Sequence, residues 1–297
     1  MCRPSGLCIM ASQCHFSLTT PFLHAMNRGD LAVYLKIGAR IMSDFSGKAV
    51  LVTGVGTGIG WATCKHFAKA GAWVALNDIQ LDLAESAASK INAELGADLV
   101  VPYACDVADV AAVRAMISHF AALHDRLDVV VANAGLTSFG AFLDYAPENF
   151  DRIVAVNLRG SFFTAPAGAQ EMIARGIAGR IILTSSVTGV QAYPNLSAYG
   201  MTKAAIQFMA KIMAVELGSY KITVNTITPG AVATERTLKD EPDYEARWGK
   251  LTPTRRSSTV DDIAAATMFF ASPEAAQLTG QNLILDGGWT LTSPIPE

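Results

Sequence analysis

Charged residues are scarce in this sequence, and neither sign dominates. Only 16% of its 297 residues are charged, and 23 Lys and Arg stand against 26 Asp and Glu, a formal net charge of −3. Because no run of Lys or Arg occurs, the sequence offers no basic patch for binding the phosphate backbone of a nucleic acid. Uninterrupted apolar runs of about 20 residues, the length of a membrane-spanning helix, are also missing. The sequence therefore predicts neither a nucleic-acid partner nor a membrane span.

Metal-ligand patterns are missing as well. The five cysteines are Cys2, Cys8, Cys14, Cys64 and Cys105. The five histidines are His15, His24, His66, His119 and His124. No cysteine pair has the spacing of a zinc site with a matching second pair or histidine pair. We predict no metal site, solvent-facing histidines, reduced thiols and a cytoplasmic location.

Acidic residues are nearly missing from residues 1–42, where Asp30 alone stands against four basic residues. Three interpretations are open: an organelle-targeting leader, a disordered extension, or sequence upstream of a native start at Met42. We favour the last, because the residues after Met42 lead directly into the first predicted strand. We expect an N-terminal extension over 1–42, disordered or not native, and one catalytic domain over 43–297.

A regular alternation of β-rich runs and helical segments follows. It predicts a single-domain α/β fold: a Rossmann-type, doubly wound, parallel seven-stranded sheet with helices on both faces. The predicted strands cover 49–53, 73–77, 99–104, 128–132, 180–184, 223–227 and 282–285. Long helical segments are predicted at 147–175, with a kink at Pro166, and from Ser197 to about Leu217.

A glycine-rich turn, Thr53-Gly-Val-Gly-Thr-Gly-Ile-Gly60, lies between the first predicted strand and helix. Glycines permit a tight turn and bring backbone N–H groups close to phosphate oxygens at a helix N-terminus. The strand–turn–helix context makes this a candidate dinucleotide site.

Asp78 ends the second predicted strand, about 20 residues beyond the glycines. A carboxylate there can accept hydrogen bonds from an adenosine ribose and would repel a 2′-phosphate. Ile79 and Gln80 follow it, so no adjacent cation would attract that phosphate. We predict NAD as the cofactor, in preference to NADP.

Tyr199 and Lys203 are four residues apart on a predicted helix and project from one face. An ammonium near a phenol favours the phenolate, so we expect Lys203 to lower the pKa of Tyr199. Ser186 follows a predicted strand, at the edge of the sheet where open α/β folds bind ligands. These three side chains predict proton transfer at an alcohol or ketone oxygen.

These motifs together resemble the short-chain dehydrogenase/reductase family over about residues 47–289. The turn has that family's Gly-x-x-x-Gly-x-Gly spacing, and Ser186, Tyr199 and Lys203 match its catalytic residues. Further matches are Cys105-Asp-Val107, Asn133-Ala-Gly135, Asn157, Pro229-Gly-x-x-x-Thr234 and Asp286-Gly-Gly288.

The resemblance implies a role for each matched residue. The catalytic residues would be Asn157, Ser186, Tyr199 and Lys203, with Asn157 supporting Lys203 through a water. The cofactor would meet Gly54, Gly58, Ile59, Gly60, Asp78, Asp106, Val107, Asn133, Gly135, Tyr199, Lys203, Pro229, Val232 and Thr234. The substrate would meet Ser186 and Tyr199, joined by Gln191 and Tyr193, which soon follow Ser186.

The activity implied is hydride transfer between NAD(H) and a secondary alcohol or ketone. Gln191 and Tyr193 offer hydrogen bonds and an aromatic face that suit a small sugar, polyol or cyclic alcohol, and the chain is similar to glucose 1-dehydrogenase. Two alternatives stay open. The first is a beta-ketoacyl-ACP reductase, because the chain is also similar to these enzymes. Their usual cofactor is NADPH, which Asp78 disfavours. The second is a catalytically silent protein that binds the dinucleotide as a sensor. The presence of all four catalytic residues argues against this alternative, because a sensor needs none of them.

Two further expectations concern a lid and an assembly. The polar, Pro-interrupted segment 235–256 is expected to cover the site as a lid. The two long predicted helices carry apolar residues on more than one face: Phe162, Phe163, Met172, Phe208, Met209 and Ile212. Because the family commonly pairs these helices between subunits, we expect a homodimer or homotetramer. The alternative is that all six side chains pack inside one subunit.

Overall fold

The computed structural model describes residues 44–292, so the predicted extension over 1–42 lies outside the described residues. Seven parallel strands form one sheet in the order β3-β2-β1-β4-β5-β6-β9. They are β1 (Ala49–Thr53), β2 (Trp73–Asp78), β3 (Val100–Ala104), β4 (Val129–Ala132), β5 (Arg180–Thr184), β6 (Thr223–Pro229) and β9 (Asn282–Leu285). The predicted fold class is confirmed, with strand ends within two residues of those expected.

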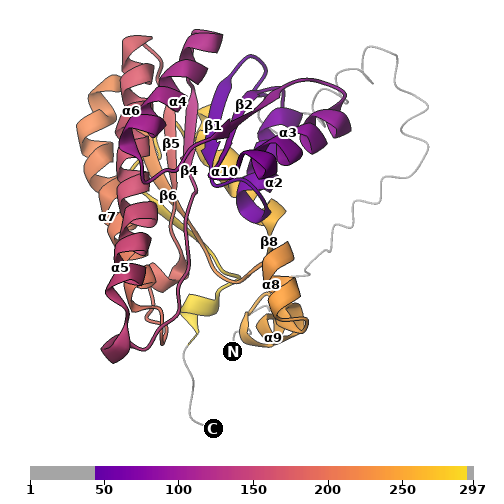
Figure 1. Ribbon diagram of the computed structural model, residues 1–297, viewed down its shortest axis with the longest axis vertical. Coiled ribbons are helices and arrows are strands. Elements are labelled where there is room, and N and C mark those ends of the chain that lie inside the picture. The colour runs from indigo at the N-terminus through magenta and orange to yellow at the C-terminus, as the bar shows by residue number, and fades with distance from the viewer. Residues whose placement is uncertain (1–43, 293–297) are drawn as a thin grey trace, which may run out of the picture. The chain divides into compact units, whose positions relative to one another are not determined.

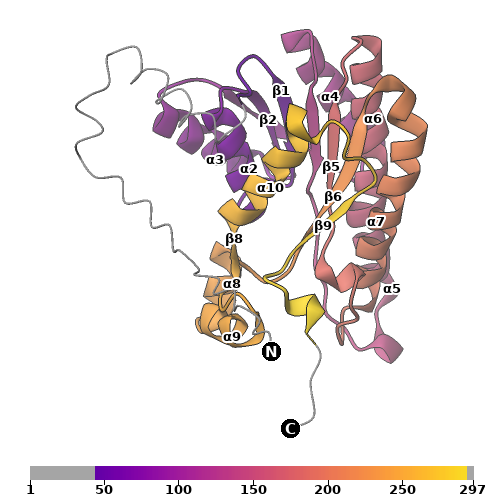
Figure 2. The same ribbon diagram turned by 180° about the vertical axis from the view of Figure 1, so that it is seen from behind.

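Helices cover both faces of the sheet (Figures 1 and 2). On one face lie α2 (Gly58–Lys69), α3 (Leu81–Leu95) and α10 (Val260–Ala271). On the other lie α4 (Val110–His124), α6 (Ser161–Ala174) and α7 (Ser197–Leu217). Each face of the sheet has its own apolar core, and successive side chains of β1 point to alternate faces. Leu51 packs with α4, α6 and α7, whereas Val50 and Val52 pack with α2, α3 and α10.

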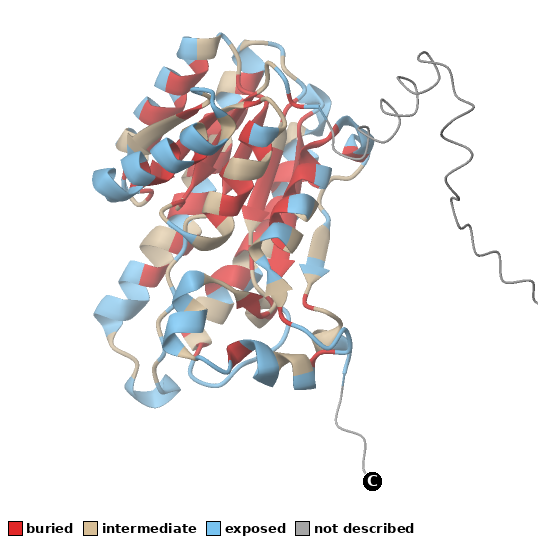
Figure 3. Cartoon of the chain, turned by 90° about the vertical axis from the view of Figure 1, so that its right-hand side faces the viewer, coloured by how far each residue is buried: buried red, intermediate tan, exposed pale blue. Residues whose placement is uncertain are grey.

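Burial is concentrated in the strands and in the helix faces turned toward them (Figure 3). All five residues of β1 and all seven of β6 are buried. Both faces of a parallel sheet are covered, so β1 carries a nearly continuous apolar run, whereas β6 also buries polar residues such as Asn225 and Thr226. The order of the strands reverses between β1 and β4, so a crevice is expected at the carboxyl ends of these two strands.

The long helical stretch predicted at 147–175 is not one continuous α-helix. It consists of α5 (Pro147–Ile153), a π-helical turn η3 (Val154–Gly160) and α6. Pro166 lies inside α6, and the departure from α-helical geometry lies before it, in η3. Gly160 closes this turn against Val107, where an added Cβ would lie 2.9 Å from a methyl group of that valine.

The histidine expectation is wrong for His124. Its ring stacks on Trp73 with the ring centroids 4.5 Å apart, and its Nε2 is buried without a hydrogen-bond partner. Burial lowers the pKa of His124. This packing joins the end of α4 to β2 and could not be read from a helix considered alone.

Cys64 and Cys105 are buried free thiols. Over residues 44–292, no group of His, Cys, Asp and Glu is arranged to hold a metal ion. No helix within the same range combines the length and the apolar character needed to cross a bilayer.

Candidate active site

The glycine turn follows the carboxyl end of β1, beside β4, and packs directly on the loop after β4. An added Cβ on Gly54, whose φ is +69°, would lie 2.5 Å from the Cα of Ala134. Asn133 ties the two segments together, because its Nδ2 donates to the carbonyl oxygens of Thr53 (3.0 Å) and Gly54 (2.9 Å). Asn133 therefore holds the shape of the turn.

The N-terminus of α2 has the free donors that a phosphate needs. Thr57 precedes the helix without a side-chain capping hydrogen bond, and the first turn of α2 has no acidic residue. In contrast, Asp109 caps α4 by accepting from two backbone N–H groups. Since the first N–H groups of a helix have no partner within it, the uncapped start of α2, with Gly58, Ile59 and Gly60, fits a pyrophosphate.

Asp78 lies over the same turn. Its Oδ2 accepts from the N–H of Gly56 at 2.8 Å, and its Oδ1 accepts from the N–H of Gln80 at 3.1 Å. A carboxylate has about four lone-pair positions, so acceptor capacity is left for ribose hydroxyls.

The remaining predicted cofactor residues include some near the turn, some at and after the end of β6, and Asp106 and Val107 after β3. Thr234 caps α8 (Glu235–Asp240), and its methyl group lies 3.5 Å from the Cβ position of Gly58. Pro229 ends β6 and Val232 is buried in β7 (Val232–Ala233), which pairs with β8 (Ser258–Thr259). Asp106 is exposed and accepts from the N–H of Ala108 at 2.9 Å.

Tyr199 lies in the first turn of α7 and is half-buried. The hydroxyl groups of Ser186 and Thr137 lie close enough to its phenol to influence the pKa of Tyr199. Burial, the strongest influence, raises the pKa of Tyr199 above its usual value near 10. The two hydroxyl groups and the positive charge of Arg236 lower the pKa of Tyr199 without reversing this direction.

The expectation that Lys203 lowers the pKa of Tyr199 is therefore wrong: this pKa is raised, and Lys203 is not among the groups that lower it. The Lys203 ammonium is 5.5 Å from the centroid of the Tyr199 ring, but it donates to the carbonyl oxygen of Thr184 at 2.8 Å. Lys203 is 4% exposed, and burial lowers its own pKa to about 8. Desolvation opposes the charged forms of both the Tyr199 phenol and the Lys203 amine. The four-residue spacing on the helix gives no information about desolvation.

A short contact between the end of β5 and α7 places Ser186 beside Tyr199. Gly189 ends a 3₁₀ turn, η4 (Val187–Gly189), and an added Cβ there would lie 2.7 Å from backbone atoms of Lys203 and Ala204. Ser185 donates to the carbonyl oxygen of Lys203 at 2.8 Å.

Asn157 is fully buried in the π-helical turn. Its Oδ1 accepts from the N–H of Leu136 at 2.7 Å, and its Nδ2 donates to the carbonyl oxygen of Leu136 at 2.9 Å and to Thr202 Oγ1 at 3.3 Å. The side chain thus holds the loop after β4. Asn157 Oδ1 and Lys203 Nζ both lie 3.4 Å from the Cβ position of Gly135.

The predicted substrate residues Gln191 and Tyr193 are exposed on the loop before α7. Tyr193 is close enough to Tyr244, in α9 (Tyr244–Leu251), for their charges to interact.

The segment predicted to form a lid contains two helices, α8 and α9, which follow the carboxyl end of β6 (Figure 1). An edge-to-face contact of Trp248 with Trp289, at 5.4 Å, ties α9 to the C-terminal segment.

Three contributors to this site were not predicted: Thr137, Thr184 and Gln207. Gln207 donates to Ser185 Oγ at 2.9 Å and so fixes the end of β5 on α7. Thr184 and Thr137 are polar residues at or soon after the carboxyl ends of β5 and β4. That placement is the one signal that could have identified the two threonines.

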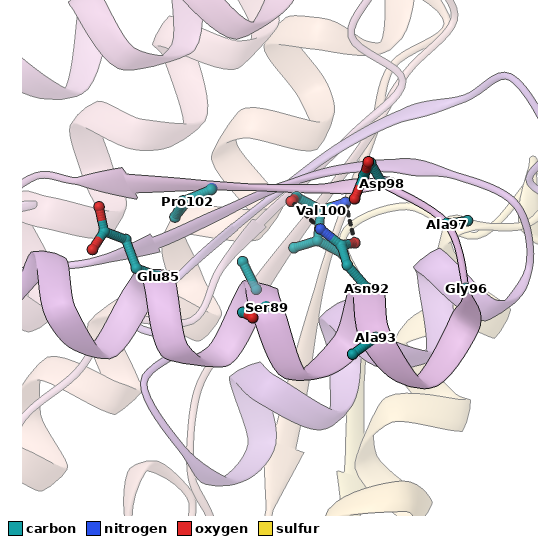
Figure 4. A pocket seen from close by; sticks show the side chains of 10 residues that line it. Glu85, Ser89, Asn92, Ala93, Gly96, Ala97, Asp98, Val100 and Pro102 are labelled. Carbon is teal, nitrogen blue, oxygen red and sulfur yellow. Dashed lines mark hydrogen bonds between the residues drawn. The ribbon is translucent and has the colours of Figure 1, made fainter.

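One surface cavity lies away from this site. It has a volume of about 570 Å³ and lies between α3 and the edge strand β3 (Figure 4). Asn92, which lines it, donates to the Val100 carbonyl and accepts from the N–H groups of Leu99 and Val100. A second cavity of about 370 Å³ borders Ser197 and Ala198, next to Tyr199.

Comparison with known proteins agrees with this geometry. A family model described as enoyl-(acyl carrier protein) reductase matches residues 54–290. D-threitol dehydrogenase of Mycolicibacterium smegmatis is 36% identical over 247 residues, which cover 82% of this chain and 94% of that protein.

Two solved structures are similar over most of the chain. A short-chain type dehydrogenase/reductase of Mycobacterium marinum has a TM-score of 0.78 and 35% identity, covering 84% of this chain and 98% of its own. A gluconate 5-dehydrogenase of Burkholderia cenocepacia in complex with NADP and tartrate has a TM-score of 0.77 and 35% identity, covering 84% and 97%. The chain belongs to the short-chain dehydrogenase/reductase family, whose members bind a nicotinamide dinucleotide and act on alcohol and ketone groups.

Proposed function

We propose that this enzyme transfers a hydride between NAD(H) and a secondary alcohol or ketone of a small sugar, polyol or cyclic alcohol. The observation that carries the proposal is the meeting of the Tyr199 phenol, the Ser186 hydroxyl and the Lys203 ammonium beside the glycine turn. The similarity to a D-threitol dehydrogenase and a gluconate 5-dehydrogenase supports a polyhydroxy substrate.

Each of these side chains has a task in alcohol oxidation. A bound nicotinamide supplies the hydride acceptor. Tyr199, as phenolate, takes the hydroxyl proton of the alcohol, and in the reverse direction it returns a proton to the ketone oxygen. Ser186 donates to the substrate oxygen. Lys203, held on the Thr184 carbonyl, places positive charge near the phenol and would hold the nicotinamide ribose.

Tyr199→Phe and a substrate panel test this assignment. The panel contains polyols, sugars, cyclic alcohols and a beta-ketoacyl thioester, each run with NAD and NADP side by side while absorbance of the reduced nicotinamide is followed. We expect turnover on polyhydroxy or cyclic alcohols, and a loss of several orders of magnitude in Tyr199→Phe with dinucleotide binding retained. Near-normal turnover in that variant would contradict the acid/base role. Dinucleotide binding without turnover on the whole panel would favour the sensor.

NAD preference rests on Asp78. Its carboxylate lies over the glycine turn, 2.8 Å from the Gly56 nitrogen, and would repel a 2′-phosphate. We expect NAD to bind about tenfold or more tightly than NADP, and Asp78→Ala to remove most of this difference. Direct calorimetric titration of both dinucleotides measures it; equal affinities in the wild type would refute NAD preference.

Assembly, domain extent and location are part of the same proposal. Of the six apolar residues considered for assembly, Met172 and Met209 are buried, whereas Phe162, Phe208 and Ile212 are 47%, 63% and 47% exposed. These exposed side chains support a homodimer or homotetramer through α6 and α7.

We propose residues 43–297 as the catalytic domain. The buried free thiols support a cytoplasmic location.

A further inference from the structure

Ser186 has a hydroxyl neighbour in its own turn, Thr188, to which the proposed mechanism gives no task. The Thr188 hydroxyl donates to Ser186 Oγ at 3.0 Å, and the N–H of Thr188 donates to the same oxygen at 3.3 Å. Both residues are half-buried. A serine hydroxyl has two lone pairs and one hydrogen, so these two bonds occupy both of its acceptor positions. The hydrogen is what remains of Ser186 for a further partner.

Thr188 is held in place by the helix that carries Tyr199. An added Cβ on Gly200, the residue after Tyr199, would lie 2.9 Å from the carbonyl oxygen of Thr188. An added Cβ on Gly189 would lie 2.7 Å from the carbonyl carbon of Lys203. Backbone of η4 therefore touches backbone of α7 at two successive residues. Because threonine is branched at Cβ, its hydroxyl has few positions open to it once the backbone is fixed.

A capping role for Ser186 explains only one of the two bonds. Ser186 precedes η4 and accepts from the N–H of Thr188, as a residue that caps a turn does. That role uses one lone pair, and the Thr188 hydroxyl occupies the second. A serine with a free lone pair could accept a hydrogen bond from an alcohol substrate. It would then compete with Tyr199 for the proton that oxidation has to remove.

We propose that Thr188 is a positioning residue that makes Ser186 a donor toward the substrate oxygen. With both lone pairs of Ser186 occupied, the alcohol keeps its own hydrogen for Tyr199. The negative charge that develops on the substrate oxygen as this proton leaves is stabilised by the hydrogen of Ser186. In ketone reduction the same hydrogen polarises the carbonyl group. The catalytic part of this inference rests on the proposed function, whereas the bond between the two hydroxyls does not.

Unfolding of a double-mutant cycle tests the bond without any turnover. The cycle consists of the wild type, Thr188→Val, Ser186→Ala and the double variant, since valine keeps the branched shape of threonine and lacks the hydroxyl. Urea midpoints are measured for all four proteins. We expect Thr188→Val to be more destabilising in the wild type than in Ser186→Ala, where the Thr188 hydroxyl has already lost its acceptor. Equal midpoint shifts in the two backgrounds would overturn the proposal.

Turnover of the same cycle tests the positioning role. For alcohol oxidation, Thr188→Val should lower kcat by about threefold to tenfold, because one hydrogen bond that orients Ser186 is lost. Thr188→Ser keeps the hydroxyl and should restore kcat to within about twofold of wild type. In the Ser186→Ala background, Thr188→Val should have no further effect on kcat, since Thr188 acts through Ser186. The affinity for NAD should be the same in every variant.

Val190→Thr is the matched control, because Val190 directly follows η4 and is 49% exposed. It should keep the wild-type kcat. Equal losses of kcat in Thr188→Ser and Thr188→Val, or an undiminished loss in the Ser186→Ala background, would assign Thr188 a packing role and reject the proposal. A wild type that turns over no substrate would refute the proposed function, and the unfolding cycle would then decide by itself whether the two hydroxyls are bonded.

Discussion

Lys203 carries its ammonium into a nearly closed site, where the Thr184 carbonyl oxygen lies 2.8 Å away. Its exposed fraction is 4%, and its pKa falls from 10.5 to about 8. A group that needs its charge for function is thus held where the charge is costly. The cost follows from burial alone, and it appears as a pH dependence of stability.

Lys203→Met should reveal this cost. Between about pH 8 and about pH 10.5 the unfolded chain binds the lysine proton that the folded chain has released, so wild-type stability should rise with pH across this window. The methionine variant lacks this contribution. Relative to Lys203→Met, the wild type should gain about 2–3 kcal/mol in free energy of unfolding from pH 7 to pH 10. Urea denaturation of both proteins at the two pH values measures the difference; a gap independent of pH would contradict the depressed pKa.

Among elements, the contact of η4 with α7 determines how Ser186 faces Tyr199 and Lys203. Gly189 permits this contact, since a Cβ would lie 2.7 Å from the backbone of Lys203 and Ala204. Backbone cannot yield as the end of a flexible side chain does. A methyl group at this position must therefore separate the two elements and move the Ser186 hydroxyl away from the phenol.

Gly189→Ala is expected to cost about 1–3 kcal/mol of stability and to lower kcat by more than tenfold. Gly218→Ala is the matched control, because Gly218 has a helical conformation and nothing within 4 Å of its Cβ position. That control should be neutral or slightly stabilising. Thermal unfolding and turnover are measured on both variants. Equal behaviour of the two would show that the close approach at Gly189 does not matter.

For the whole molecule, α7 has an apolar stripe that its own subunit leaves uncovered. Phe208, Ile212 and Val215 are 63%, 47% and 84% exposed, and their spacing puts them on one face of the helix. Exposed apolar surface of this kind commonly marks an interaction site. A second copy of the chain is the partner that the proposed assembly supplies.

Phe208→Asp combined with Val215→Asp should therefore lower the oligomeric state, because two carboxylates cannot be buried in an apolar interface without a large penalty. Leu123→Asp is a control on α4, since Leu123 is 57% exposed outside the stripe. Light scattering at micromolar concentration reads the mass. A wild type that is already monomeric would reject the assembly.

The start of the folded part is a second property of the whole molecule. Phe45 is 3% exposed, and its ring meets Phe67 edge to face at a centroid distance of 5.0 Å. A chain beginning at Met42 keeps this contact, and we expect wild-type stability and turnover. A chain beginning at Gly47 loses Phe45 and should be less stable by about 3–5 kcal/mol. Denaturant unfolding and turnover of both shortened chains are compared; lost turnover in the Met42 chain would reject the proposed domain boundary.

Local sequence was sufficient to predict the sheet, because β-rich runs, helical periodicity and glycine turns are properties of near neighbours in the chain. All seven strands of the sheet were predictable, as were the start of α7 at Ser197 and the glycine turn before α2. The family motifs added candidate site residues, although their roles stay predictions. Resemblance to a family identifies residue types and their spacing. It does not show how far each side chain is removed from water in the folded chain.

The side-chain contacts and the electrostatics of the site depend on three-dimensional packing. The direction of the Tyr199 pKa, the capture of Lys203 by Thr184 and the approach of Thr137 to the phenol all depend on segments far apart in the chain. The π-helical turn around Asn157 and the stacking of His124 on Trp73 have the same origin. Desolvation and side-chain contact are set by what packs around a group, and that packing exists only once the strands, helices and loops have assembled.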